Sequence, residues 1–318
     1  MTAPITIAHL SDLHLSAVHK RSHIRRTRRA LDYVNGLGVD HVVITGDITA
    51  DGTPEDYRVA RSVLASAGML TSSRLTVAIG NHDVFGGVHT AEDVLSFPGR
   101  CARTDEKAQL KAFGAAFHET FPGAIMPSEK RLFPFAKIIG DMAVIAVNTI
   151  APYSRVKNPL GSNGSVDDRS FDTLRELLAS PAIRPKRKII ALHHHFHKMR
   201  DAREGAVHSV WSAIERQTMK LRGKSRLLKL FAQHHVDLVL HGHIHQSAEY
   251  QRDGVRFLNG GGSILHDESP DLHINLINFH ATGCTTEIHR VPFGELPIRI
   301  DASHPAPGPL LTTGHVAA

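Results

Sequence analysis

The chain carries short, continuous apolar runs separated by longer segments in which apolar residues follow helical spacing. The runs expected to form strands are 5–10, 41–46, 75–79, 143–147, 187–192 and 236–241. Continuous apolar runs of this length are typical of strands that are buried on both faces of a sheet. The segments expected to form helices are 22–37, 53–68, 168–179 and 208–233. This alternation predicts an α/β layered fold.

Helix-end residues refine this pattern. Pro54 suits the first position of a helix, Ser22 is a candidate N-cap, and Gly223 is expected to interrupt the segment 208–233. The last part of the domain changes to segments of strand character. These are residues 247–252, 255–259, 272–279 and 284–291.

Residues 84–132 break the alternation. They contain several Gly and Pro residues and one expected helix at 106–120, so we interpret them as an insertion or cap over the site. We expect residues 1–300 to form one domain. Residues 301–318 are rich in Pro, Gly and Ala, which predicts a disordered tail.

Composition excludes several classes of protein. An apolar fraction of 42% and a charged fraction of 21% over 318 residues are ordinary for a globular protein. No apolar run reaches membrane-spanning length. The N-terminus lacks the basic region of a signal peptide, and two cysteines make no disulfide framework, so a cytoplasmic location is expected. The net charge of +6 favours anionic partners.

Polar side chains with metal-binding chemistry follow five of the expected strands. They occur in Ser11-Asp12-Leu13-His14, Gly46-Asp47, Gly80-Asn81-His82-Asp83, His193-His194-His195 and Gly242-His243-Ile244-His245. Open α/β sheets place their ligands at the carboxyl ends of strands. Carboxylate, amide and imidazole groups together suit borderline divalent ions such as Mn, Fe, Zn or Co. Each residue alone has an ordinary structural explanation, but the five groups together predict a hydrolytic centre with two metal ions.

The order D-x-H, G-D, G-N-H-D, H and G-H-x-H resembles that of the calcineurin-like metallophosphoesterases. Within that family it is most similar to the bacterial class III phosphodiesterases, which include cyclic-AMP and glycerophosphodiester hydrolases. The resemblance covers about residues 5–260. It implies a four-layer α/β/β/α sandwich with two mixed sheets and two divalent metal ions.

The resemblance also implies a division of the ligands between the two ions. The first ion takes Asp12, His14, Asp47 and His245. The second takes Asp47, Asn81, His193 and His243, so that Asp47 is the bridge. His193 is preferred to His194 as the ligand because it directly follows the strand.

His82 is expected to be catalytic. By resemblance it stays off the metals and faces the substrate, where it stabilises the transition state or protonates the leaving oxygen. Asp83 is expected to orient His82 or to cap the next segment. A structural hydrogen bond is the alternative role for His82.

Four residues near the site are candidates for substrate binding. They are His194, His195, His197 and Asn148. His195 and His197 suit either the pocket or the surface, and Asn148 suits a pocket contact or a turn.

Two basic segments have a functional and a structural interpretation. Residues 19–29 form either a rim that attracts phosphate or an anionic membrane surface, or a solvated helix face, which is the commoner case. Residues 216–231 interleave basic and apolar side chains. They suit either a transient contact with an anionic membrane surface or, more simply, a core helix with a basic outer face.

The leading hypothesis is a phosphodiesterase in which a metal-bound hydroxide attacks phosphorus. The substrate classes are a cyclic nucleotide, a glycerophosphodiester or a phospholipid head group. A phosphomonoesterase on the same centre and a catalytically idle binding or scaffold module are the alternatives. Nucleic acid is a disfavoured partner because only 6% of the residues are aromatic and no nucleic-acid module is recognisable. The sequence leaves the oligomeric state open.

Overall fold

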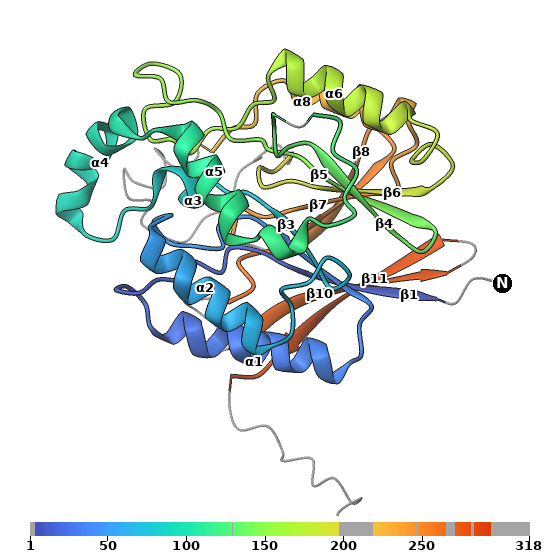
Figure 1. Ribbon diagram of the computed structural model, residues 1–318, viewed down its shortest axis with the longest axis horizontal. Coiled ribbons are helices and arrows are strands. Elements are labelled where there is room, and N and C mark those ends of the chain that lie inside the picture. The colour runs from blue at the N-terminus through green and yellow to red at the C-terminus, as the bar shows by residue number, and fades with distance from the viewer. Residues whose placement is uncertain are drawn as a thin grey trace, which may run out of the picture.

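The fold consists of two mixed sheets packed face to face, with helices on both outer sides (Figure 1). This arrangement confirms the expected four-layer α/β/β/α sandwich. The computed structural model describes residues 4–128, 130–196, 219–245, 247–264, 271–280 and 283–293. None of the described helices has the length and apolar character needed to cross a bilayer.

The first sheet has five strands in the order β11-β10-β1-β2-β3. Their bounds are β1 (Ile5–Leu10), β2 (His41–Thr45), β3 (Leu75–Ala78), β10 (Leu272–His280) and β11 (Gly283–Val291). Strands β1, β2 and β3 are parallel, and β10 pairs antiparallel with β1 and with β11. The two expected C-terminal strands, β10 and β11, thus extend the sheet that the N-terminal strands β1, β2 and β3 form.

The second sheet has six strands in the order β4-β5-β6-β7-β9-β8. Their bounds are β4 (Phe135–Ile139), β5 (Met142–Ala146), β6 (Arg187–Ala191), β7 (Leu238–His241), β8 (Ala248–Arg252) and β9 (Val255–Asn259). Strands β5, β6, β7 and β9 are parallel, and the edge strands β4 and β8 are antiparallel to their neighbours.

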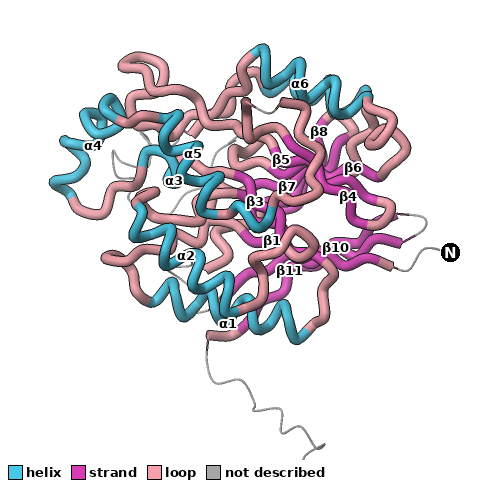
Figure 2. The backbone as a smooth tube through the Cα atoms, viewed as in Figure 1, coloured by secondary structure: helices cyan, strands magenta, loops and turns pink. Residues whose placement is uncertain are grey.

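Helices cover the outer face of each sheet (Figure 2). Over the first sheet lie α1 (Ser22–Gly36) and α2 (Pro54–Ser66), and over the second lie α6 (Asp168–Ala179) and α8 (Lys224–Gln233). Pro54 is at the start of α2, as expected, and the Thr53 side chain caps that helix. Ser22 begins α1 but makes no side-chain cap, in contrast to the expectation.

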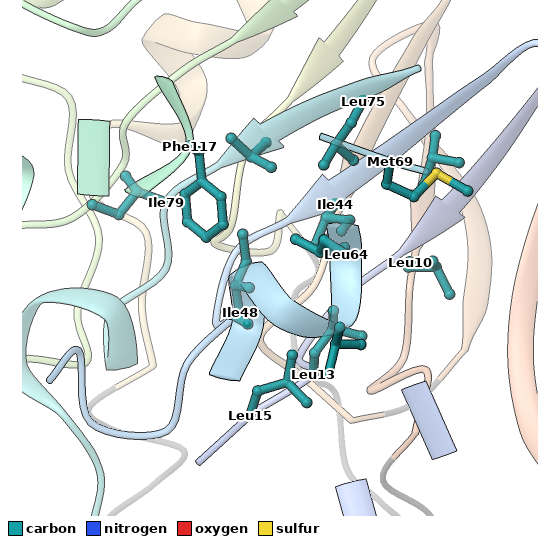
Figure 3. Close-up of a cluster of buried hydrophobic side chains, with 14 of the residues drawn as sticks. Leu10, Leu13, Leu15, Ile44, Ile48, Leu64, Met69, Leu75, Ile79 and Phe117 are labelled. Carbon is teal, nitrogen blue, oxygen red and sulfur yellow. The ribbon is translucent and has the colours of Figure 1, made fainter. Parts of the chain in front are cut away.

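Strand residues alternate between two hydrophobic clusters, which explains why the runs are continuously apolar. Ile7 and Val43 point into the layer between the sheets, where they join Val144 of the second sheet. Ala8 and Ile44 point the other way, into the layer under α1 and α2. Figure 3 shows this outer layer, in which Leu10, Ile44 and Leu75 of the strands meet Leu64 of α2.

The insertion at 84–132 is built largely of helices. It contains α4 (Ala91–Arg103), α5 (Glu106–Ala116) and the 3-10 turn η1 (His118–Thr120), and it follows the short α3 (His82–Phe85). Phe113 and Phe117 are fully buried in the outer layer of the first sheet. The second half of the insertion is therefore part of the core, and Phe97 and Cys101 of its first half belong to the same cluster.

The basic segment 208–233 is described from residue 219 onward. Gly223 has a φ of 73° and directly precedes α8, which begins at Lys224. Residues 208–218 lie outside the described residues. Leu227, Leu230 and Phe231 of α8 are buried against the second sheet. These contacts support the interpretation of the described part of 216–231 as a core helix.

The fold should lose stability in acid because it contains buried neutral histidines. His41 is one of them, and it lies away from the metal-type ligands. Its ring bonds the Ser73 carbonyl and the Thr76 hydroxyl, each at 2.8 Å. Burial lowers the pKa of His41 from 6.5 to about 3. The unfolded chain therefore binds this proton at a higher pH than the folded chain does, so stability falls as pH drops from about 6.5 towards about 3.

We expect His41→Gln to remove part of this acid sensitivity, on the order of a few kcal/mol. The measurement is the free energy of unfolding in urea at about pH 7.5 and about pH 4.5, with chelator present to remove metal effects. The variant should lose less stability between the two pH values than the wild type. An equal loss in both proteins would contradict the assignment.

Candidate metal centre

The structure brings all seven predicted metal ligands together at one edge of the two sheets. Asp12, Asp47 and Asn81 follow β1, β2 and β3, and His193 and His243 follow β6 and β7. The loops of the first sheet contact those of the second, because the backbone amide of His243 donates to both carboxylate oxygens of Asp12 at 3.1 and 3.2 Å. The parallel strands of each sheet thus deliver their following loops to a common point.

Several of these residues have a left-handed backbone. Their φ values are 57° at Asp12, 43° at His14, 49° at Asp47 and 73° at His243. Side chains other than that of glycine rarely adopt this region, and the strain it stores is concentrated at functional sites. The tight turns aim successive side chains back over the ends of the strands.

Asp47 lies at the centre of the arrangement and is almost fully buried. Its Oδ2 atom is 3.2 Å from His193 Nε2 and 3.8 Å from His14 Nε2. Its Oδ1 atom accepts a hydrogen bond of 2.8 Å from the backbone amide of His82. Burial opposes ionisation, but the neighbouring His193 and His82 hold the pKa of Asp47 well below its ordinary range. The carboxylate is therefore charged, and the nitrogens of His193 and His14 lie near its Oδ2 atom.

One set of electron-rich atoms surrounds His193. Its Nδ1 donates to the Thr45 carbonyl at 2.8 Å, so in the neutral ring Nε2 carries a lone pair. That atom lies 3.0 Å from Asn81 Oδ1 and 3.0 Å from His243 Nδ1. Neighbouring ligands bound about 2.1 Å from one ion are separated by about 3 Å. The spacing of these atoms therefore fits a divalent cation.

The atoms that suit a cation also attract a proton. Burial disfavours the charged ring of His193, but Asp47 outweighs this and raises the pKa of His193 to about 9. Metal binding and protonation are alternatives at such a site because the ligand nitrogen must be deprotonated.

A second set of ligand groups lies on the other side of Asp47. Asp12, His14 and His245 each offer one ligand atom, and these atoms lie within 4.8 Å of one another. His14 Nε2 is buried and has no hydrogen-bond partner among the described residues. Burial, followed by repulsion from His82, keeps the pKa of His14 well below 6.5. A neutral imidazole nitrogen without a partner is the form that binds a metal.

His82 lies at the edge of both sets. Its Nδ1 bonds the carbonyl of Ala50 at 2.9 Å, which fixes the proton on Nδ1 because a carbonyl only accepts. Its Nε2 then points to the site, 4.0 Å from Asp47 Oδ2. The side chain is 26% exposed, whereas that of His193 is fully buried. His82 is thus placed to reach a substrate.

The first of the two roles expected for Asp83 is not seen, because the ring of His82 is oriented by the Ala50 carbonyl. The buried Asp83 carboxylate accepts from the amides of Thr49 and Gly80, each at 2.9 Å. It thereby ties the loop that carries Asp47 to the loop that carries Asn81. Burial, and then the charge of Asp47, raises the pKa of Asp83 to about 6.

A pocket of about 310 Å³ opens over the centre. Its lining includes five of the predicted ligands and His82. The lining also includes His19, Lys20, Val88, His89, Phe97, Leu160 and Met219. Most of this second group were not predicted as site residues. The segments that carry them contain no metal-type motif, and tertiary packing brings them to the pocket.

The described residues that were predicted to bind substrate are not among those that line the pocket. Buried His194 bonds the Thr149 hydroxyl at 2.8 Å and the Ser162 carbonyl at 3.2 Å. Asn148 accepts from the amide of Ile150 at 2.8 Å, which is a turn contact.

His195, which is also buried, bonds the Met219 carbonyl at 2.9 Å. We propose that His194, His195 and Asn148 support the loops around the site. His197 lies outside the described residues.

Comparison with known proteins agrees with this geometry. The sequence profile of the calcineurin-like phosphoesterase family matches residues 5–247. A probable cyclic nucleotide phosphodiesterase of Rhodococcus erythropolis is 24% identical over 78% of this chain and 67% of its own length. A cAMP/cGMP dual specificity phosphodiesterase of Mycobacterium tuberculosis is 24% identical over 78% of this chain and 64% of its own length. The chain thus spans about two thirds of the length of these relatives.

The fold also has solved counterparts. A purple acid phosphatase from yellow lupin (Lupinus luteus) seeds superposes with a TM-score of 0.55 and 13% identity. The match covers 91% of this chain and 52% of that one. At this level of identity the likeness concerns the fold alone.

Gly80 should be indispensable for metal binding. A Cβ atom there would overlap the backbone nitrogen and Oδ1 of Asp47, so Gly80→Ala must displace the central carboxylate. We expect loss of metal, measured by elemental analysis after reconstitution, with a smaller effect on secondary structure. Gly36→Ala is the matched control because nothing lies within 4 Å of the added carbon. Full metal content in Gly80→Ala would contradict the assignment.

Proposed function

Because the chain belongs to the calcineurin-like phosphoesterase family, a family of metal-dependent hydrolases of phosphoric esters, we propose that it hydrolyses a phosphodiester at a centre of two divalent ions. One observation carries the proposal. Two sets of ligand atoms, around His193 and around His14, share the single carboxylate of Asp47. Mn, Fe, Zn and Co all suit these mixed nitrogen and oxygen donors.

The geometry together with the resemblance supports one division of the ligands. Asp12, His14 and His245 would hold the first ion, and Asn81, His193 and His243 the second, with Asp47 between them. Two carboxylates facing two divalent ions leave a net positive site, which suits an anionic ester. Two ions about 3.5–4 Å apart polarise phosphoryl oxygens and lower the pKa of water.

The protein side chains do the remaining work. Hydrolysis forms one bond from a water oxygen to phosphorus and breaks the bond from phosphorus to the leaving oxygen, which needs a proton. His82 is placed to supply that proton from Nε2, because its Nδ1 is held by the Ala50 carbonyl. The protonated ring also stabilises negative charge on the phosphoryl group in the transition state.

The lining of the pocket supports a diester that carries an organic group. Val88, Phe97 and Leu160 contribute apolar surface, and Lys20 adds a positive charge. The names of the two relatives favour a cyclic nucleotide over a glycerophosphodiester or a phospholipid head group. A screen of the metal-reconstituted protein against all three classes tests this preference.

Two alternatives remain distinguishable by experiment. A phosphomonoesterase would prefer p-nitrophenyl phosphate to bis-p-nitrophenyl phosphate. An idle scaffold would hydrolyse neither, and it is disfavoured because all seven ligand positions of the motif are occupied by suitable residues.

Removal of the shared carboxylate should abolish activity. Asp47→Ala leaves two like charges without their common ligand, so we expect loss of at least one metal ion and of nearly all turnover. Elemental analysis and a phosphodiester assay test this, with Asp172→Ala on the exposed side of α6 as the control. An active variant that retains two ions per chain would rule out a bridging role.

Removal of the His82 ring should separate catalysis from metal binding. His82→Ala is expected to retain both ions and to lose turnover, because positioned acid–base help is typically worth about 10²–10⁴ in rate. The loss should be smaller for a p-nitrophenyl diester than for an alkyl diester, since p-nitrophenolate leaves without a proton. Equal losses would indicate charge stabilisation alone, and loss of metal would make His82 a ligand.

A further inference from the structure

A second polar cluster lies beside the candidate centre, where the loops after β1 and β2 meet the segment between α3 and α4. His89 Nε2 is 2.8 Å from both carboxylate oxygens of Asp51. The His89 ring stacks on that of His19, with centroids 4.0 Å apart. His19 and His89 line the pocket, whereas Asp51 borders a neighbouring depression. The proposed function assigns nothing to this cluster.

Two imidazoles and a carboxylate are a familiar donor set, but this geometry does not suit a metal ion. The two rings are stacked face to face with their planes only 16° apart. A metal ion binds close to the plane of an imidazole, about 2.0–2.1 Å from the nitrogen. One ion cannot lie in two separate and nearly parallel planes. The cluster is better described as a hydrogen-bonded pair, Asp51 and His89, packed against His19.

Asp51 also holds the turn that lies over His82. Its Oδ1 accepts a hydrogen bond of 3.1 Å from the amide of Gly87. A Cβ atom on Gly87 would lie 2.5 Å from Cε1 and 2.6 Å from Nδ1 of His82, so the glycine backbone packs directly on that ring. The residue before Asp51 is Ala50, whose carbonyl accepts from His82 Nδ1. Two adjacent residues therefore hold both the ring and the turn that covers it.

We propose that Asp51 is a positioning residue that acts through His82, with His89 as the partner that holds the Asp51 carboxylate in place. The proposal rests on the proposed function, in which His82 delivers a proton to the leaving oxygen. Proton transfer requires donor–acceptor distances of about 2.6–3.2 Å. The Arg100 guanidinium also bonds the Gly87 carbonyl. Loss of the Asp51 carboxylate therefore loosens the Gly86–Gly87 turn without releasing it, and lets the imidazole shift out of this range.

A double-mutant cycle tests the proposal. Asp51→Ala should retain both metal ions and lose about 10- to 100-fold in kcat on an alkyl diester, the usual cost of removing a supporting partner. The loss on a p-nitrophenyl diester should be smaller. Asp51→Ala combined with His82→Ala should be no slower than His82→Ala alone, because non-additivity is the mark of residues that act together. Asp51→Asn, which keeps an acceptor for the Gly87 amide, should recover most of the turnover.

Asp93→Ala is the matched control. Asp93 accepts from the amides of His89 and Thr90, each at 3.0 Å, in the same segment. It has no contact with Gly87 or His82 in the described part of the chain, so kcat should change little. Equal losses in Asp93→Ala and Asp51→Ala would overturn the proposal, as would independent, additive losses in the double variant.

A second measurement does not depend on activity. The proton on His82 Nδ1 should give a slowly exchanging NMR signal, assigned by its absence in His82→Ala. That signal should broaden or disappear in Asp51→Ala and persist in Asp93→Ala. A signal unchanged in Asp51→Ala overturns the positioning role. Failure of the proposed function would instead appear as a wild-type protein without phosphodiesterase activity, or as full turnover in His82→Ala.

Discussion

Electron-rich atoms from several loops converge on the Asp47 carboxylate, and the rest of the site depends on how their mutual repulsion is balanced. Nε2 of His193 and Nε2 of His14 lie 3.2 and 3.8 Å from Asp47 Oδ2. In a buried position such atoms need a cation or a proton between them. The raised pKa of His193 and the unpartnered nitrogen of His14 are two consequences of this one requirement. A pair of divalent ions would satisfy both sides of the carboxylate.

The fold maintains this arrangement with rigid parts. Parallel strands of two sheets end at the same edge, and strained turns at Asp12 and Asp47 direct the ligand side chains inward. Asp83 ties the second and third loops of the first sheet through backbone amides. On our account Asp51 does the same for the turn over His82. The proposed metal ligands, the proposed catalytic group and the supporting carboxylates thus come from a few loops that are fixed to one another.

Much of the fold and of the ligand set could be predicted from the sequence, because both depend on local patterns. Continuous apolar runs identified strands such as β1 and β2, and a metal-type residue after each strand identified the loops. The supporting contacts could not be predicted in this way. Asp83 follows His82 in the chain, yet its carboxylate bonds Thr49 and Gly80, and only the tertiary structure shows that geometry.

The residues that line the pocket could not be predicted for the same reason, since tertiary packing decides which they are. His194 and Asn148 were expected at the substrate because they follow strands. In the structure His194 bonds the Thr149 hydroxyl of a neighbouring loop, and Asn148 bonds the Ile150 amide within its own turn. His89 and Phe97 belong to the insertion and carry no motif, yet they line the pocket. Adjacency in sequence predicted which loops meet, but not which residues line the pocket beside them.

Anomalous X-ray diffraction from crystals of the manganese-loaded protein, recorded at the manganese absorption edge, tests the central claim most directly. The account predicts two peaks about 3.5–4 Å apart, both bonded to the Asp47 carboxylate, with Nε2 of His82 bonded to neither. A single peak, or two peaks that share no Asp47 oxygen, would contradict it.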